Sequence, residues 1–435
     1  MFSRVLTYRR VMLALLLVIY AFNATDRLAL GLLLQNIKLD LALTDTQLGF
    51  LSGLAFALFY SVMGIPIARW ADRGNRVRII ALTAIVWSVM VATCGWARSF
   101  TQLLGARVGV AIGEAGCVPP AHSLIADNFD RAERPRAVAI YMLGSSIGVA
   151  IGYFFAGWIN ELYGWRATFW LLSWPGALFG LLAWRTLTEP RVGAAARKPS
   201  TCARGNPGLR ELCRTLWANR TFRHLLICFS VISFFGYGIG QWQATFFIRS
   251  FGLQTGELGS WLGLIYGVGG MVGTWLGGEA AARYASNNER LQLRVMAVLV
   301  GSFGLVYCLV YLATNRYVAL ALLALSTLSI STIIGPLFAT IQTLVPERMR
   351  AMAIALIYFF ANLVGMGLGP LAAGALSDAL NSWAGPESLR YSLLAFCPGY
   401  AWGAWHLWRA ADSVAHDLAT AATQQPMPQP LSLST

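Results

Sequence analysis

The stretch ERPRAVAI at residues 133–140 recurs as ERMRAMAI at residues 347–354, with six of the eight positions identical. In both copies a short basic segment leads directly into a long apolar run. The spacing of 214 residues indicates that the 435-residue chain consists of two related halves. Because both copies enter their apolar run from the same kind of loop, the two halves should cross a membrane in the same direction. The repeat therefore predicts a pseudo-twofold axis along the membrane normal.

The composition points to the same class of protein. Hydrophobic residues make up 57% of the chain and charged residues only 12%, which is roughly half the charged share of a soluble domain. This excludes a water-soluble globular protein, and the high hydrophobicity excludes a disordered chain. Since about 20 apolar residues span a bilayer, we predict an all-α membrane protein with twelve transmembrane helices in two six-helix halves. The predicted spans lie near residues 11–33, 47–68, 79–97, 101–125, 138–159, 167–185, 224–247, 257–280, 293–313, 317–343, 351–374 and 389–408.

The net charge of +14 reports topology and does not indicate a nucleic-acid partner. When the amino terminus is placed in the cytoplasm, 25 of the 33 Lys and Arg residues fall in cytoplasmic segments and six fall in outer loops. Cytoplasmic loops of membrane proteins carry such an excess. The alternation supports twelve spans with both termini in the cytoplasm.

The longest polar connection divides the chain into its parts. Residues 186–223 are rich in Gly, Pro, Ser and Arg, and we predict a basic cytoplasmic linker there. It joins an amino-terminal half, residues 1–185, to a carboxy-terminal half, residues 224–411. The Ala-, Gln- and Pro-rich tail, residues 412–435, is predicted to be disordered. The seven cysteines lack the spacing of a disulfide framework or a metal site, so we expect no metal and no cofactor.

The loop between the second and third spans reads ARWADRGNR at residues 68–76 and contains Asp72, Arg73 and Arg76. An aspartate here can accept backbone N–H groups of a helix end or pair with an arginine. We interpret the loop as a latch that stabilises one conformation, with an ordinary basic loop as the alternative. The equivalent stretch of the second half has Ala282 where the aspartate would stand.

Four charged residues fall inside predicted spans, where burial is costly and requires a partner or a function. Asp26 and Arg27 lie in the first span, and Arg107 and Glu114 lie in the fourth. Seven residues make nearly two helical turns, so Arg107 and Glu114 share one face of their helix. The repeat places uncharged residues at the equivalent positions of the second half, so the fold itself does not require these charges.

Glu114 is the candidate proton carrier, because a carboxyl group in a low-dielectric cavity can exchange a proton near neutral pH. Arg27 is the candidate partner of Glu114 or of an anionic substrate group, and Arg107 is a further candidate for substrate binding. Asp26 takes part in proton coupling by orienting Arg27 or Arg107. The alternative is a permanently ionised Glu114 that is paired with an arginine only for helix packing.

Several uncharged residues in the spans are weaker candidates. Tyr237, Gln241 and Gln243 in the seventh span, and Asn362 in the eleventh, can donate hydrogen bonds to a substrate from the second half; interhelical hydrogen bonding is an equally good interpretation. Thr44 and its capping-box partner three residues later predict the start of the second helix. The fifth span carries glycines that allow close helix packing: Gly144, Gly148, Gly152 and Gly157.

Six stretches together resemble the Spinster branch of the major facilitator superfamily, particularly its bacterial members. They are NATDR at 23–27, TDTQLG at 44–49, DRGNR at 72–76, GVAIGEA at 109–115, GLGP at 367–370 and SD at 377–378. The match covers roughly residues 15–400. It implies the major facilitator fold, export of lysophospholipids or sphingolipids, proton coupling, and functional roles for Arg27 and Glu114. With the short termini and the arginine bias, it also implies a multi-pass protein of a bacterial inner membrane.

The leading hypothesis is a secondary transporter that moves an amphiphilic or lipid-like solute by alternating access, coupled to protons through Glu114. Its partners would be this substrate, protons and membrane lipids, and nothing in the sequence requires a protein partner. The alternatives are a proton-linked carrier of small organic anions, such as aromatic or carboxylic acids, and a membrane receptor that does not transport. No catalytic constellation or phosphate-binding loop indicates an enzyme or an ATP-driven pump.

Overall fold

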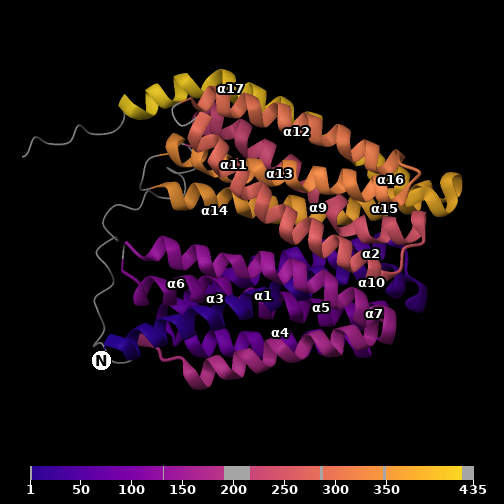
Figure 1. Ribbon diagram of the computed structural model, residues 1–435, viewed down its shortest axis with the longest axis horizontal. Coiled ribbons are helices and arrows are strands. Elements are labelled where there is room, and N and C mark those ends of the chain that lie inside the picture. The colour runs from indigo at the N-terminus through magenta and orange to yellow at the C-terminus, as the bar shows by residue number, and fades with distance from the viewer. Residues whose placement is uncertain (1, 131, 191–215, 285–287, 346–348, 424–435) are drawn as a thin grey trace, which may run out of the picture.

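The computed structural model describes residues 2–130, 132–190, 216–284, 288–345 and 349–423, and within these ranges every regular element is helical. Figure 1 shows two helical bundles lying side by side, one for each half of the chain. The first half contains α1 (Phe2–Leu41), α2 (Asp45–Ser52), α3 (Leu54–Arg73), α4 (Arg76–Trp96), α5 (Phe100–Glu114), α6 (Val118–Asn128) and α7 (Arg134–Thr186). The second half contains α9 (Arg220–Phe251), α10 (Thr255–Leu262), η3 (Gly263–Gly269), α11 (Gly270–Tyr284), α12 (Glu289–Leu312), α13 (Arg316–Leu344), α14 (Arg350–Phe360), η5 (Ala361–Leu368), α15 (Gly369–Ala384), η6 (Gly385–Glu387), α16 (Ser388–Phe396) and α17 (Gly399–Thr423).

These pieces make up the twelve predicted spans. Eight helical stretches among the described residues are long and apolar enough to cross a membrane. Two of these stretches hold two spans each: α7, which bends at Gly164 with a φ of 81°, and the stretch from α14 to α17. The remaining two spans are α5 with α6, which a turn at residues 115–117 separates, and the continuous helical run of α10, η3 and α11. The twelve-helix fold is therefore confirmed.

The second half carries two π-helical segments, η3 and η5. A π-helix fits one extra residue into a turn and is frequent at functional sites. Both segments contact the first half, η3 against α7 and η5 against α3.

The helix starts follow local sequence. The side chain of Thr44 accepts a hydrogen bond from the backbone N–H of Gln47, and the Gln47 side-chain oxygen accepts one from the backbone N–H of Thr44, as the capping-box prediction requires. Asn75, Asn219 and Asn288 cap α4, α9 and α12 through their side-chain oxygens. These caps satisfy backbone N–H groups that would otherwise lack partners in the first turn.

Glycines bring α1 and α7 into close contact within the first half. A Cβ atom on Gly148 would lie 2.8 Å from the carbonyl carbon of Ala21, and one on Gly152 would lie 2.9 Å from the Cα atom of Thr25. The Thr25 hydroxyl also donates a hydrogen bond of 2.9 Å to the Gly148 carbonyl. Small residues allow this approach, which stabilises helix pairs in membranes.

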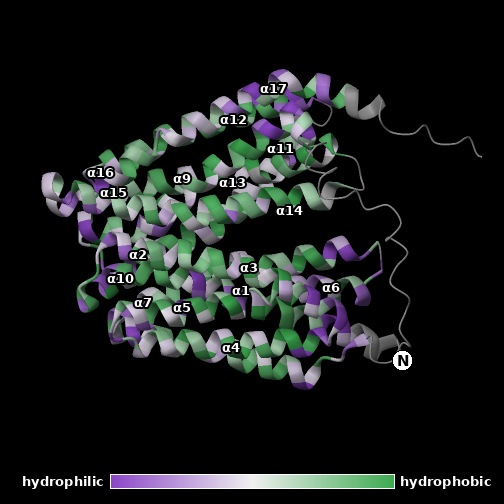
Figure 2. Ribbon diagram, turned by 180° about the vertical axis from the view of Figure 1, so that it is seen from behind, coloured by the Kyte–Doolittle hydropathy of each residue, from purple (hydrophilic) through white to green (hydrophobic). Residues whose placement is uncertain are grey.

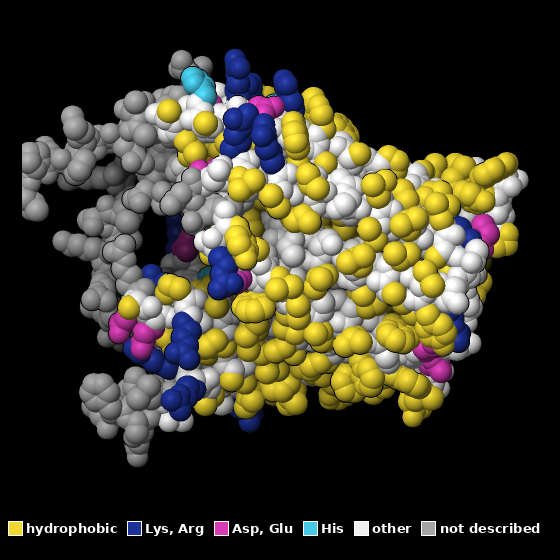
Figure 3. All heavy atoms as spheres, turned by 45° about the horizontal axis from the view of Figure 1, so that its top comes forward, with side chains coloured by type: hydrophobic (Ala, Val, Ile, Leu, Met, Phe, Trp, Pro, Cys, Tyr) yellow, Lys and Arg dark blue, Asp and Glu magenta, His cyan; other side chains and the backbone are white. Residues whose placement is uncertain are grey.

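The bundle has two polar ends and an apolar middle. Figure 2 shows hydrophilic residues gathered at the two ends of the helices, and in Figure 3 hydrophobic side chains cover the middle of the visible face. We call the end that bears the amino terminus, the loop at Gly74–Asn75 and the start of α9 the linker end. The end that bears the starts of α2 and α10 is called the opposite end. In Figure 3 most of the visible Lys and Arg side chains lie toward the linker end, as the charge alternation predicts.

The described structure differs from the prediction in the tail. Residues 412–435 were expected to be disordered, but α17 continues to Thr423. Asp417 anchors this extension, since its carboxylate accepts a hydrogen bond of 2.7 Å from the backbone N–H of Thr221 at the start of α9. Most of the predicted linker and the last twelve residues lie outside the described residues.

Candidate functional site

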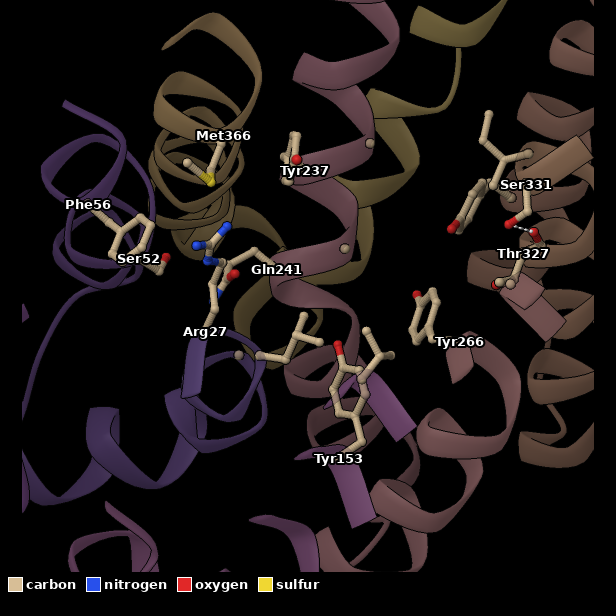
Figure 4. A pocket seen from close by; sticks show the side chains of 18 residues that line it. Arg27, Ser52, Phe56, Tyr153, Tyr237, Gln241, Tyr266, Thr327, Ser331 and Met366 are labelled. Atoms are coloured by element: carbon tan, nitrogen blue, oxygen red, sulfur yellow. Dashed lines mark hydrogen bonds between the residues drawn. The ribbon is translucent and has the colours of Figure 1, made fainter. Parts of the chain in front are cut away.

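A cavity of about 320 Å³ lies between the two halves, lined by helices of both. Figure 4 shows Arg27 reaching into it from α1, with Gln241 beside it and Tyr153 and Tyr266 further along the wall. Among the described residues that line it, Arg27 alone carries a charge. Most of the other lining side chains are apolar or aromatic, and the polar ones include Ser52, Tyr153, Tyr237, Gln241, Tyr266, Tyr307, Thr327 and Ser331.

Arg27 forms an ion pair with Glu114. Its Nη2 and Nε atoms lie 2.7 and 3.1 Å from the same oxygen, Oε2 of Glu114. The Glu114 side chain is completely buried, whereas 32% of the Arg27 side chain is exposed to the cavity. The second carboxylate oxygen, Oε1, has no hydrogen-bond partner in the described protein. One oxygen of Glu114 therefore binds the guanidinium, and the other is left without a hydrogen bond in the described protein.

Aromatic rings complete the surroundings of the arginines. The guanidinium carbon of Arg27 lies 5.1 Å from the ring centroid of Phe56 and 4.9 Å from that of Tyr60. Arg107 is also 5.1 Å from the Phe56 centroid. Such cation–π contacts stabilise desolvated cations by about 2 kcal/mol. Phe56 therefore holds both guanidinium groups near one ring.

Among the described residues, Asp26 makes no hydrogen bond or ion pair with an arginine, and its role in orienting Arg27 or Arg107 stays a prediction. The indole N–H of Trp87 donates a hydrogen bond of 2.9 Å to Oδ2 of Asp26, and Oδ1 has no hydrogen-bond partner in the described protein. Arg107 is 1% exposed, does not line the cavity, and leaves its Nε and Nη1 groups without hydrogen-bond partners. Arg107 and Asp26 therefore lie behind the cavity wall.

Two of the four polar candidates from the second half reach the cavity. Tyr237 and Gln241 line it. Gln243 is fully buried, and its side-chain oxygen accepts a hydrogen bond of 2.7 Å from the Tyr311 hydroxyl. Asn362, in η5, is not among the lining residues. For Gln243 the structure therefore favours interhelical hydrogen bonding over substrate contact.

The sequence analysis missed the aromatic wall of the cavity. Tyr153 of α7 and Tyr266 of η3 stack across the two halves with ring centroids 5.8 Å apart. In the sequence, Tyr153 stands out only because it follows Gly152, one of the glycines of the fifth span. Nothing in the sequence marks Tyr266 as a cavity residue.

In the loop that we interpreted as a latch, the Arg76 side chain is fully buried at the start of α4, and the latch role itself stays a prediction. Arg76 pairs with Glu189, just beyond α7, and its Nη1 atom lies 2.6 Å from Asp127 of α6. Asp72 and Arg73 are exposed at the end of α3. The loop thus joins three elements of the first half at the linker end.

The opposite end of the cavity is closed by charged contacts between the halves. Asp45 begins α2, is 1% exposed, and accepts hydrogen bonds from both terminal nitrogens of Arg249 in α9, at 2.7 and 2.8 Å. Lys38 Nζ and the Ser377 hydroxyl donate two more, at 2.6 and 2.7 Å. The sequence could have pointed to these contacts, because Asp45 and Ser377 lie in two of the six stretches that resemble the Spinster branch.

The described residues hold no group of three or more His, Cys, Asp or Glu side chains that could bind a metal ion.

Comparisons with known proteins agree with this geometry. The model of the Major Facilitator Superfamily matches residues 16–370. An MFS-type efflux pump of Mycolicibacterium smegmatis is 32% identical over 376 residues, which cover 86% of this chain and 85% of the pump. A probable L-galactonate transporter of Escherichia coli is 26% identical over 391 residues, covering 85% of this chain and 84% of the transporter.

A solved structure is also similar over nearly its whole length. It is the crystal structure of a bacterial homologue of the human lysosomal transporter Spinster, in an inward-facing and unoccupied conformation. It has a TM-score of 0.83 at 29% sequence identity, and the alignment covers 94% of this chain and 98% of that one.

Proposed function

The chain belongs to the major facilitator superfamily, and we propose that this multi-pass secondary transporter moves an amphiphilic, lipid-like solute together with protons. The observation that carries the proposal is the cavity between the halves, where one exposed guanidinium, Arg27, is paired with the fully buried carboxylate of Glu114. An apolar, aromatic wall with a single cationic site suits an amphiphile that has an anionic head.

The charge distribution supports an orientation with the linker end and both termini in the cytoplasm of a bacterial cell, and the protein in the inner membrane. In that orientation the closed opposite end faces outward. The conformation is then inward-facing, in agreement with the conformation of the similar Spinster homologue.

Proton coupling follows from competition for Arg27. While Glu114 is ionised, its carboxylate neutralises the guanidinium. When Oε1 takes up a proton, the carboxyl group loses its charge and the Coulombic attraction to Arg27 is lost, so an anionic substrate group can take its place. A proton and a monoanionic head therefore bind together and leave together. Alternating access then carries both from one side of the membrane to the other.

The apolar and aromatic side chains that line the cavity favour a lipid-like substrate over a small anion. From Arg27 in α1 the cavity extends to Tyr307 in α12 and to Thr327 and Ser331 in α13, so a ligand that fills it contacts both halves. A long apolar tail gains stabilisation from the aromatic wall, at about 25 cal/mol per Å² of buried apolar surface. The second candidate is a carrier of small organic anions, which the L-galactonate relative supports.

Flux measurements in proteoliposomes test the proposal. Labelled lysophospholipid and a labelled aromatic carboxylate should be offered with and without an imposed pH gradient. We expect the gradient to drive accumulation of the lysophospholipid and the rate to rise with tail length. Faster flux of the short aromatic acid would favour the organic-anion carrier, and binding without flux of either probe would favour the receptor.

Glu114→Gln isolates the proton carrier, because glutamine keeps the shape but cannot ionise. We expect gradient-driven accumulation to be lost while exchange of substrate across the membrane continues. Asp40→Asn is the matched control, since Asp40 pairs with Arg166 at the opposite end of the first half, away from the cavity. An unchanged pH profile in Glu114→Gln would refute the coupling role.

A further inference from the structure

Two interfaces between the halves close the opposite end of the cavity, α2 with α15 and α7 with α10. In each interface a carboxylate from one half binds the first turn of a helix from the other half. We propose that these two carboxylates, Asp378 and Glu161, are gate-positioning residues for transport. They hold the opposite end closed and must release their helices whenever that end opens.

Asp378 of α15 caps the start of α2. Its Oδ1 atom accepts a hydrogen bond of 3.1 Å from the backbone N–H of Asp45. Its Oδ2 atom accepts bonds from the backbone N–H and the hydroxyl of Thr46, at 2.7 and 2.6 Å. The first N–H groups of a helix have no partners within the helix, and the positive end of the helix dipole attracts an anion. Asp378, from the other half of the protein, provides both the hydrogen-bond acceptors and the negative charge.

This cap also positions the main ion pair of the gate. The backbone N–H that Asp378 binds belongs to Asp45, whose own carboxylate binds Arg249. Holding the first turn of α2 in place therefore holds the Asp45 side chain toward α9. Asp378 acts through Asp45 and does not itself contact the cavity.

Glu161 makes the corresponding contact on the other side. Its Oε2 atom accepts a hydrogen bond of 2.7 Å from the backbone N–H of Gly256, in the first turn of α10. Neighbouring polar groups strengthen the interface: the Asn160 amide donates to the Thr255 hydroxyl at 3.1 Å, and the Trp158 indole donates to the Ser260 hydroxyl at 3.0 Å. All these contacts join α7 of the first half to α10 of the second.

The two caps occupy equivalent places in the repeat. Asp378 lies at the outer end of the fifth span of the second half, and Glu161 at the outer end of the fifth span of the first. Each binds an eight-residue helix, α2 or α10, that opens the second span of the other half. Both interfaces have a glycine facing the capped helix, Gly374 toward Asp45 and Gly157 toward Thr255. The same kind of closing contact therefore occurs at both interfaces, related by the pseudo-twofold axis.

The chemistry of these contacts suits a gate that must reopen. Separating two apolar surfaces exposes them to water at a cost that grows with area. A carboxylate and the one or two backbone N–H groups that it binds, by contrast, are hydrated once they separate, so most of the lost hydrogen bonding is recovered. The caps can therefore fix the closed position without making the opening prohibitively costly.

The test measures the distance across the opposite end, independently of any substrate. Spin labels are placed at Leu39→Cys in the first half and Ser382→Cys in the second, both exposed at that end, with the native cysteines replaced. Asp378→Asn puts an NH₂ group against backbone donors, and Glu161→Ala removes the acceptor. We expect each to raise the ratio of long to short distances by about tenfold, which is the effect of losing one good helix cap.

Further variants keep the test decisive. Glu161→Gln retains an acceptor and should restore most of the closed population. Thr46→Val removes only one donor to Asp378 and should give a smaller shift, about two- to fivefold, in case Asp378→Asn does not fold. Asp40→Asn, at the same end but paired within the first half, should leave the distances unchanged.

Unchanged distances in folded Asp378→Asn and Glu161→Ala, or a lower melting temperature without a change in distance, would overturn the proposal. An equal shift in Asp40→Asn would do the same, because any loss of charge at that end would then suffice. None of these results bears on proton coupling, which is measured separately as pH-driven flux.

Discussion

Replacing Gly157 with alanine adds one methyl group to the tightest part of the interface between α7 and α10. The new Cβ atom would lie 3.1 Å from the Cα atom of Gly259 and 3.2 Å from the carbonyl carbon of Thr255. These are backbone atoms, which cannot turn aside as a flexible side chain can. Adding a methyl group to a packed interface costs about 1–3 kcal/mol. The cost falls only on the conformation in which the two helices touch.

A penalty of this size should change the ratio of open to closed forms at the opposite end by about 5–150-fold. The labels at Leu39→Cys and Ser382→Cys report this ratio as the weight of the long-distance population. Gly259→Ala should act in the same way, because its Cβ atom would meet the backbone of Tyr153 in the same contact. The two substitutions together should give less than the sum of their separate effects, since they open one interface.

The matched control is Gly105→Ala in α5, where a Cβ atom would meet nothing within 4 Å. It carries the same gain in helix propensity, about 1 kcal/mol, without crowding an interface between the halves. If Gly157→Ala leaves the distances as they are in the parent protein, or shifts them no more than Gly105→Ala, then this interface does not open during alternating access and the reasoning is refuted.

Three other substitutions test particular contacts. Glu189→Gln leaves the buried Arg76 with a weaker set of partners and should lower the free energy of unfolding by about 3 kcal/mol, seen as a lower melting temperature; no change would mean that the ion pair is dispensable. Tyr311→Phe removes the donor to Gln243 and should lower the free energy of unfolding by about 1–3 kcal/mol, while substrate affinity stays the same. A loss of substrate affinity would instead mean that Gln243 contributes to substrate binding. Phe56→Ala removes the ring shared by two guanidinium groups and should weaken substrate binding about tenfold, as measured by titration; unchanged affinity would exclude this ring from the site.

Much of the fold could be predicted from the sequence because a bilayer leaves few choices. Backbone groups must be satisfied within each span, so long apolar runs become helices, and the alternation of basic loops predicts on which side of the membrane each loop lies. The part of the tail at residues 412–423 was predicted wrongly because composition alone does not show a tertiary anchor. In the sequence, Asp417 looks like an ordinary tail residue. Only the structure shows that its carboxylate binds the backbone N–H of Thr221, almost 200 positions earlier.

The candidate site was predictable where charge was the signal. Arg27 and Glu114 were identified as a possible pair because an isolated charge in a membrane is costly, and the structure brings them together. The partner of Asp26 was not predictable, because Trp87 is one of many aromatic residues in the spans. Gln241 and Gln243 differ by two positions, and a helix turns about 200° over that distance; sequence alone could not say which one faces the cavity.

The pairing of Arg27 with Glu114 has a consequence for membrane voltage under the proposed coupling. A proton and a monoanionic head enter together and leave together, so loading the site adds no net charge. Carrying one elementary charge across 100 mV changes the energy by about 2.3 kcal/mol, but a cycle that carries a proton with a monoanion moves no net charge through this field. Transport would then follow the gradients of pH and substrate, and a cell whose membrane is electrically depolarised would still run it.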